Sequence, residues 1–100
     1  MLIEVREASI DPLKEIGQYQ SNFARDGKFG ATASFVGSMR DFNDGVNVRS
    51  MTLEHYPGMT EKHLEEICKT AAERWTVIDI LLLHRVGNIN ISDPIVVVAV

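Results

Sequence analysis

Cysteine is almost absent from this chain of 100 residues, in which Cys68 stands alone. A single thiol forms no internal disulfide, so we expect a reducing compartment, the cytoplasm. Long apolar runs are missing as well, because no segment reaches the roughly 18 apolar residues that span a bilayer. Residues 1–6 include the acidic Glu4 and lack the apolar stretch of a signal peptide. The sequence therefore predicts a cytoplasmic protein without a membrane partner.

An excess of basic residues is also lacking, since 10 Lys and Arg stand against 14 Asp and Glu, for a net charge of −4. A nucleic-acid binder usually shows a basic stripe, so we expect no nucleic-acid partner. What is present is ordinary for a soluble globular protein, with 45% apolar and 24% charged residues. This length and composition predict a single domain over residues 1–100.

Common catalytic and cofactor motifs are missing too. The sequence has no glycine-rich dinucleotide or phosphate loop, no C-x-x-C, no H-E-x-x-H and no G-x-S-x-G. His55, His63 and His84 have no metal-like spacing with Cys68. We therefore expect no metal site and no cofactor. Cys68 lies in the middle of an apolar helical stripe, which favours a buried, inert thiol over a nucleophile.

Hydrophobic periodicity and turn residues predict two helices among five strands, in the order βαββαββ. We expect the strands over residues 2–8, 31–39, 46–55, 76–86 and 95–100, with the third paired to the second and with turns at 87–90 and 93–94. The first helix is expected to begin with Asp11 as its cap and Pro12 as its first residue, and to end by about Asn22. Thr60 is expected to cap the second helix.

The second helix carries the clearest apolar stripe, with spacings of three and four residues: Leu64, Ile67, Cys68, Ala71, Ala72 and Trp75. The unbroken apolar run Leu81–Leu83 predicts a strand that is buried on both faces. Together these elements predict the α+β class, with the sheet on one side and the helices on the other. The pattern also allows a ferredoxin-like split βαβ arrangement.

The final stretch, Ile95–Val100, is entirely apolar and has no polar residue after it. Since a free carboxylate at the end of a buried strand is costly, we expect a partner to cover this end or the natural chain to continue. We also expect this strand to be an uncovered edge that invites pairing with a second chain.

Two stretches carry candidate functional residues. Arg40 follows a strand at the loop Gly37–Asp41, and from spacing alone a surface arginine and an anion clamp stand as equal alternatives. The clamp is chemically apt because a guanidinium offers a planar fork that matches phosphate. The second stretch, Glu54–Met59, is dense in polar and turn residues, and its Pro57–Gly58 pair redirects the chain into the second helix.

These stretches resemble a known family, the large subunit of molybdopterin synthase. Gly30–Asp41 (GATASFVGSMRD) resembles its early strand and loop, and Leu53–Met59 (LEHYPGM) is similar to its most recognisable signature. His84–Gly87 (HRVG), followed by Asp93–Val96 (DPIV), resembles the next block in the expected order. The resemblance covers about residues 28–100.

The resemblance implies an α/β-hammerhead fold with a mixed, mostly antiparallel sheet packed by two or more helices. It implies a sulfurtransferase of molybdenum cofactor biosynthesis. A small, ubiquitin-like sulfur-carrier subunit would bring a C-terminal glycine thiocarboxylate into a pocket of the large subunit. Two sulfurs would be added to cyclic pyranopterin monophosphate to form the dithiolene of molybdopterin. Two large subunits would form the homodimer core of a heterotetramer.

The resemblance also assigns roles to single residues. Ser38, Met39 and Arg40 match the substrate-binding segment, although the family often has a basic residue where Ser38 stands. Phe35 would line the channel that receives the partner's tail. A cyclic phosphate substrate needs a cationic clamp, which is what Arg40 offers.

The family's catalytic groups are a His-Arg pair and two lysines that follow the last strand. The lysines of this sequence do not match them: Lys14, Lys28, Lys62 and Lys69. The catalytic residues are therefore unknown here and are expected beyond Val100. The alternative is a non-catalytic module that binds a ubiquitin-like partner.

Overall fold

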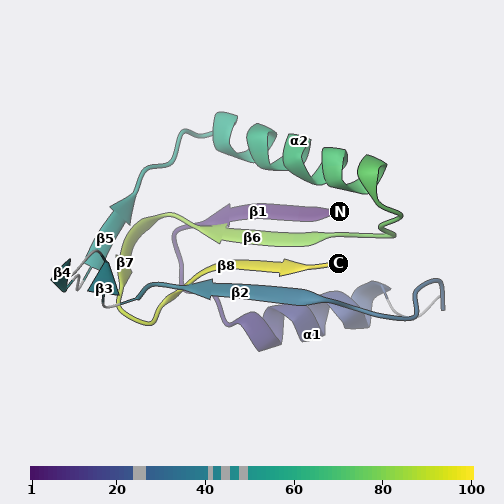
Figure 1. Cartoon of the computed structure of the whole chain (residues 1–100), viewed down its shortest axis with the longest axis horizontal. Coiled ribbons are helices and arrows are strands. Elements are labelled where there is room, and N and C mark those ends of the chain that lie inside the picture. Colours follow the sequence, from purple (N-terminus) through teal and green to yellow (C-terminus); the bar gives the residue numbers. More distant parts are fainter. Residues whose placement is uncertain (24–26, 41, 44–45, 48–49) are drawn as a thin grey trace.

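A computed structural model of the chain describes residues 1–23, 27–40, 42–43, 46–47 and 50–100. Its main element is a four-stranded sheet in the order β1 (Leu2–Arg6), β6 (Leu81–Arg85), β8 (Pro94–Ala99) and β2 (Ser34–Ser38). β1 runs parallel to β6, whereas β8 is antiparallel to both of its neighbours. The predicted α+β class with a mixed, mostly antiparallel sheet is confirmed (Figure 1).

The strand β6 forms the centre of the hydrophobic core. Leu81 and Leu83 are fully buried and Leu82 is 8% exposed. Successive side chains of a strand point to opposite faces of its sheet, so this run fills both sides. The prediction that Leu81–Leu83 is buried on both faces is confirmed.

The two helices cover opposite faces of the sheet (Figure 1). Tyr19 of α1 (Pro12–Phe23) packs in one cluster with Leu81 and Leu83, whereas Cys68 of α2 (Met59–Arg74) packs with Leu82. The prediction that both helices lie on one side is therefore wrong. Because the apolar run of β6 has no polar face, each of its faces requires its own covering helix.

The remaining strands form two small pairs at one end of the main sheet (Figure 1). β5 (Ser50–Leu53) is antiparallel to β7 (Gly87–Asn90), and β3 (Phe42–Asn43) is antiparallel to β4 (Val46–Asn47). The predicted pairing of residues 46–55 with the second strand is wrong, because β2 pairs with β8 instead. Residues 87–90 are a strand rather than a turn, since Gly87, with φ of 82°, makes the bend and Ile89 is fully buried.

The last strand is an inner strand of the sheet. β8 lies between β6 and β2, and the Val100 and Ala33 amides each donate to the other residue's carbonyl at 2.9 Å. The expectation of an uncovered edge at Ile95–Val100 is therefore wrong. The edge strands of the main sheet are β1 and β2.

The helix starts differ in how well their caps were predicted. The Asp11 carboxylate accepts a hydrogen bond from the Lys14 amide at 3.3 Å, as expected of a cap. Thr60 is not the cap of α2, because the helix already begins at Met59. The Glu61 carboxylate instead accepts from the Gly58 amide at 2.7 Å.

The apolar stripe of α2 is only partly buried. Cys68 is 3% exposed, and burial raises the pKa of its thiol, in agreement with the inert role predicted for it. Ile67 and Trp75 are at least half exposed, against the prediction. Trp75 follows the last residue of the helix, where the Arg74 guanidinium stacks over its ring at 4.7 Å.

Candidate functional site

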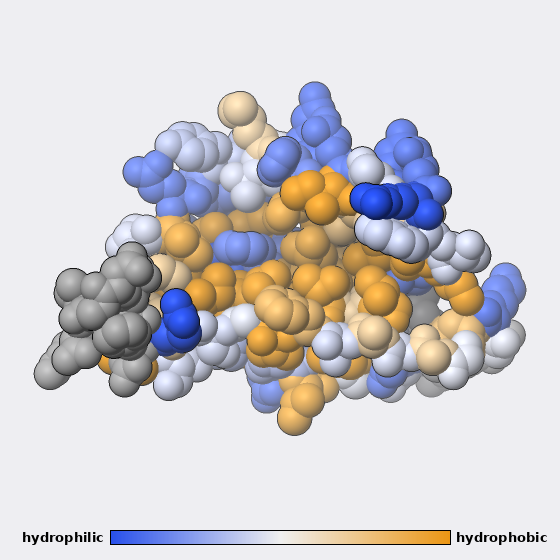
Figure 2. All heavy atoms as spheres, viewed as in Figure 1, coloured by the Kyte–Doolittle hydropathy of each residue, from blue (hydrophilic) through white to orange (hydrophobic). Residues whose placement is uncertain are grey.

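An open apolar surface lies beside α2 on the main sheet. Phe35 pairs with Val98 across β2 and β8, and Val98 packs in the cluster that α2 covers, so Phe35 is on the α2 side of the sheet. Figure 1 places α2 over β1, at the far edge from β2. Phe35 is consequently 63% exposed. Figure 2 shows apolar side chains gathered over these strands below the polar outer side of α2.

Gly37 continues this surface toward the end of β2. A Cβ atom at this position would lie 2.9 Å from Val96 Cγ1 and 3.5 Å from the Phe35 ring. Phe35, Gly37 and Val96 therefore share one face, and the missing side chain lets the Phe35 ring and Val96 approach each other. We call the surface formed by Phe35, Gly37, Val96 and Val98 the open face.

The segment Ser38–Arg40 follows directly at the end of the open face. A register shift between Gly37 and Ser38 interrupts the ladder with β8, as a β-bulge does where it redirects side chains. Met39 is 5% exposed, whereas Ser38 and Arg40 are exposed. Within the described part of the chain, no carboxylate forms an ion pair with Arg40. An exposed guanidinium is thus presented at the end of an apolar surface, which suits a ligand with an apolar part and an anionic group.

The backbone of Met39 is held by the turn between β7 and β8. The Met39 amide donates to the Asp93 carbonyl at 3.0 Å, and the Ser92 amide donates to the Met39 carbonyl at 2.9 Å. Arg85, which is 9% exposed, donates to the Asp93 carboxylate at 2.8 Å. Hydrogen bonds from the Asn90 amide and from Arg85 hold the pKa of Asp93 below its ordinary value.

The stretch Glu54–Met59 builds the entry to α2. His55 Nε2 lies 2.7 Å from one Glu61 carboxylate oxygen, and the Gly58 amide donates to the other. The Tyr56 hydroxyl donates to Glu54 at 2.6 Å. A hydrogen bond from its own backbone amide, the His55 side chain and the Gly58 amide, in that order, lower the pKa of the Glu61 carboxyl. These contacts give the signature-like stretch a structural role, as Pro57–Gly58 suggested.

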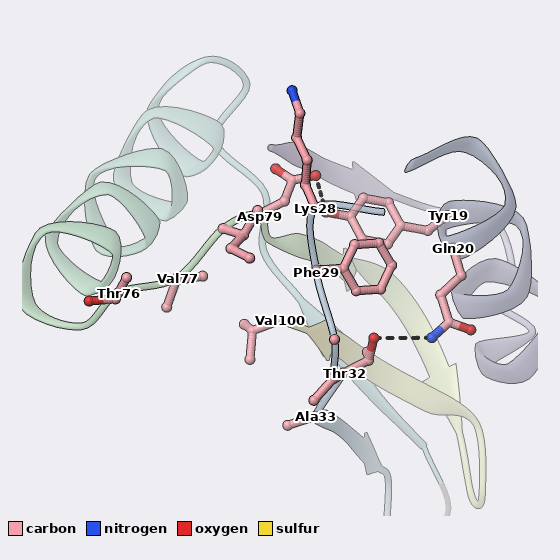
Figure 3. A pocket seen from close by; sticks show the side chains of 13 residues that line it. Tyr19, Gln20, Lys28, Phe29, Thr32, Ala33, Thr76, Val77, Asp79 and Val100 are labelled. Atoms are coloured by element: carbon pink, nitrogen blue, oxygen red, sulfur yellow. Dashed lines mark hydrogen bonds between the residues drawn. The ribbon is translucent and has the colours of Figure 1, made fainter. Parts of the chain in front are cut away.

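A cavity of about 530 Å³ lies at the other end of the main sheet, where β2 begins and β8 ends (Figure 3). Tyr19 donates to Asp79 at its wall, and Gln20 donates to Thr32 at 3.1 Å. Val100 also lines it. None of the predicted site residues lies in this cavity.

Grouped metal-ligating side chains and membrane-spanning helices are both absent from the described residues. Among them, no three His, Cys, Asp or Glu side chains are grouped so as to hold a metal ion. Neither α1 nor α2, the helices of this described part, combines the length and apolarity needed to cross a membrane.

Sequence reasoning missed the pair formed by Arg85 and Asp93. Both residues belong to stretches that it singled out, but no role was assigned to either one. The available signal was an arginine at the end of the buried run Leu81–Leu83, because a guanidinium rarely enters a core without a carboxylate partner.

The fold and the site define a class: an α+β protein with helices on both faces of a mixed sheet and an apolar surface that ends at an exposed arginine. Comparison with known proteins identifies the family within this class. The model of the MoaE protein family matches residues 6–100, and the chain belongs to this family.

Named relatives and solved structures agree with this assignment. The molybdopterin synthase catalytic subunit of Ralstonia nicotianae is 50% identical over 98 residues, which are 98% of this chain and 54% of that protein. The MoaE protein of Burkholderia ambifaria superposes with a TM-score of 0.81 at 44% identity, over 98% of this chain and 61% of that one. The molybdopterin synthase structure from Staphylococcus aureus superposes with a TM-score of 0.79 at 29% identity, over 97% of this chain and 67% of that one. The chain thus spans little more than half the length of its Ralstonia relative.

Proposed function

We propose that the complete protein containing this chain is the catalytic subunit of molybdopterin synthase and acts in the cytoplasm. It would transfer sulfur from the C-terminal thiocarboxylate of a small, ubiquitin-like subunit to cyclic pyranopterin monophosphate. Support comes from membership of the MoaE family and from relatives that bear this enzyme's name.

The observation that carries the proposal is the arrangement along β2. Phe35 is exposed on the open face, and Arg40 is exposed just beyond the same strand. An extended peptide tail would lie over Phe35 with its last residue toward the Arg40 end of β2. The substrate phosphate would then bind Arg40, as planar guanidinium forks do.

In this arrangement the chain's own residues bind and orient the reactants. The thiocarboxylate sulfur is the nucleophile: it forms a C–S bond to a side-chain carbon of the pterin as an oxygen leaves that carbon. Water then hydrolyses the resulting thioester, so the sulfur stays on the pterin and the tail leaves as a carboxylate. Arg40 holds the phosphate and so fixes the distance between the reacting atoms. The groups that activate the sulfur are proposed to lie beyond Val100, because the lysines of this chain do not match the family's catalytic ones.

The proposed assembly is a heterotetramer. Two copies of the complete protein would form a central dimer, and one small subunit would bind at each end. The exposed Phe35 and the half-buried Val96 and Val98 of the open face give the small subunit's tail an apolar surface to cover.

Reconstitution tests the proposal directly. The complete protein, thiocarboxylated small subunit and precursor are expected to yield molybdopterin. Arg40→Ala should weaken precursor binding by about 1.5–3 kcal/mol, the scale of a hydrogen bond to a charged group. Precursor binding is measured by calorimetry, and circular dichroism reports whether the fold is intact.

Arg74→Ala is the matched control, because Arg74 is also exposed but ends α2 at the opposite end of the molecule (Figure 1). This variant should bind precursor like the wild type. An unchanged dissociation constant in Arg40→Ala would return Arg40 to an ordinary surface role. Absence of product with a bound small subunit would favour the non-catalytic binding module.

A further inference from the structure

The segment Ser38–Arg40 has its position set by another part of the chain. Its middle residue, Met39, is buried and exchanges two backbone hydrogen bonds with Ser92 and Asp93. β2 is an edge strand, and its ladder with β8 shifts register at Gly37–Ser38. The regular sheet therefore ends before Arg40, and beyond that point the turn at residues 91–93 holds the backbone in place of the strand ladder.

This turn depends on the Asp93 carboxylate. Its Oδ2 atom accepts from the Asn90 amide at 3.0 Å and from Arg85 Nη1 at 2.8 Å, while the Asp93 amide donates to the Asn90 carbonyl at 3.1 Å. Ser92 has a φ of 69°, a left-handed conformation that costs free energy in a residue other than glycine. A strained turn persists only where its surroundings hold it, and here the carboxylate closes it.

Arg85 connects this turn to the rest of the fold. Besides Asp93, its guanidinium donates to the Glu7 carbonyl at 3.2 Å, just after β1, and to the Asn88 carbonyl of β7 at 3.3 Å. One buried side chain thus fixes three segments of chain relative to β6. Its fork needs these separate directions, which a lysine ammonium does not reproduce.

From this chain of contacts we infer that Arg85 and Asp93 are positioning residues for Arg40. They act through the Met39 backbone and touch no substrate themselves. The consequence for binding rests on the proposed function, because it assumes that Arg40 holds the phosphate. The hold of Arg85 and Asp93 on the backbone of Ser38–Arg40 does not depend on what Arg40 binds.

Amide hydrogen exchange in the complete protein, read by NMR, tests the positional claim. Asp93→Asn and Arg85→Lys should speed exchange at the Met39 and Ser92 amides about tenfold, as local opening becomes easier. The Val97 amide, in the middle of β8, should keep its wild-type rate. Two variants are used so that the test survives if one of them fails to fold.

Glu15→Gln is the matched control, because it removes the charge from a separate arginine–carboxylate pair, in which Arg6 Nη1 lies 2.5 Å from Glu15. All three amides should keep their rates in this variant. Wild-type protection at Met39 and Ser92 in both Asp93→Asn and Arg85→Lys overturns the inference.

A double-mutant cycle tests the consequence for binding. Asp93→Asn should weaken precursor binding about three- to tenfold when Arg40 is present and have no further effect in Arg40→Ala, because coupled residues are not additive. An equal loss in both backgrounds overturns the claim that Asp93 acts through Arg40. If Arg40→Ala alone binds like the wild type, the proposed clamp fails, and the exchange rates still decide whether Arg85 and Asp93 position the segment.

Discussion

At the scale of single residues, the closest constraint on the candidate site is Gly37. A methyl group there would lie 2.9 Å from Val96 Cγ1, closer than non-bonded carbon atoms approach each other in proteins. Val96 is β-branched and stands on an inner strand, so its side chain cannot turn away freely. Gly37→Ala should therefore lower the free energy of unfolding by about 1–3 kcal/mol, the usual cost of overpacking. Urea unfolding of the complete protein measures this change.

Gly17→Ala provides the opposite control within α1. Nothing lies within 4 Å of an added Cβ at Gly17. Alanine also has a higher helix propensity than glycine, so the free energy of unfolding of this variant should rise by about 0.5–1 kcal/mol. If Gly37→Ala were as stable as the wild type, the close packing of Val96 against Gly37 would be disproved.

Residue-level prediction from sequence succeeded where the cause is local. Asp11 and Pro12 start a helix through their own chemistry, and the burial of Leu81–Leu83 follows from an unbroken apolar run. It failed for Trp75, because its exposure depends on where α2 ends relative to the sheet. The roles of Ser38 and Phe35 remain proposals.

At the scale of elements, α1 is tied to the start of β6 through a single carboxylate. Asp79 accepts from the Tyr19 hydroxyl and lies 2.8 Å from the Met1 ammonium. Burial opposes its charged form, but these partners hold the pKa of Asp79 below its ordinary 3.8. Its contribution to stability is therefore complete above pH 3.8 and is lost as the pH falls through the lower, folded value.

Asp79→Asn should cost about 1.5–3 kcal/mol of unfolding free energy at pH 6, where the wild-type carboxylate is ionised. The difference from the wild type should shrink as the pH falls below 3.8. Glu66→Gln, on the exposed side of α2, serves as the control with little effect at either pH. A loss that is the same at pH 6 and at pH 2.5 would show that the charge is irrelevant.

Helix boundaries were predicted better than strand boundaries and strand partners: the strand expected over 76–86 begins only at Leu81, and the one expected over 46–55 is split into β4 and β5. The helices begin and end within about two residues of expectation, because helix caps and apolar periodicity depend on residues that are close together in the sequence. The pairing of β2 with β8, and of β5 with β7, joins segments far apart in the sequence. Such choices depend on which apolar faces meet in space, and no local pattern contains that information.

At the scale of the whole molecule, the two faces of β2 differ, because only one of them belongs to the open face. Phe35 and Val36 are neighbours on β2, and both are exposed, but they point to opposite faces of the sheet. If the small subunit's tail lies on the open face, Phe35→Asp should weaken its binding at least about tenfold through the lost apolar contact. Surface plasmon resonance with the immobilised small subunit measures the change.

Val36→Asp is the control on the same strand, and it should change the affinity less than about threefold, since exposed sites away from a contact are tolerant. Equal effects of the two substitutions would mean that the partner does not distinguish the faces, and the proposed channel would be wrong.

The central place of β6 also has a consequence in time. The ribosome synthesises β1 first, yet Leu2 pairs with Leu81, and β2 likewise pairs with β8, which is synthesised much later. Pairing between segments so distant in sequence is slow and leaves apolar strands uncovered meanwhile. The strands β1 and β2 therefore have no neighbour in the main sheet while the first half of the polypeptide is synthesised, and we expect this sheet to assemble late, once residues 81–99 are made.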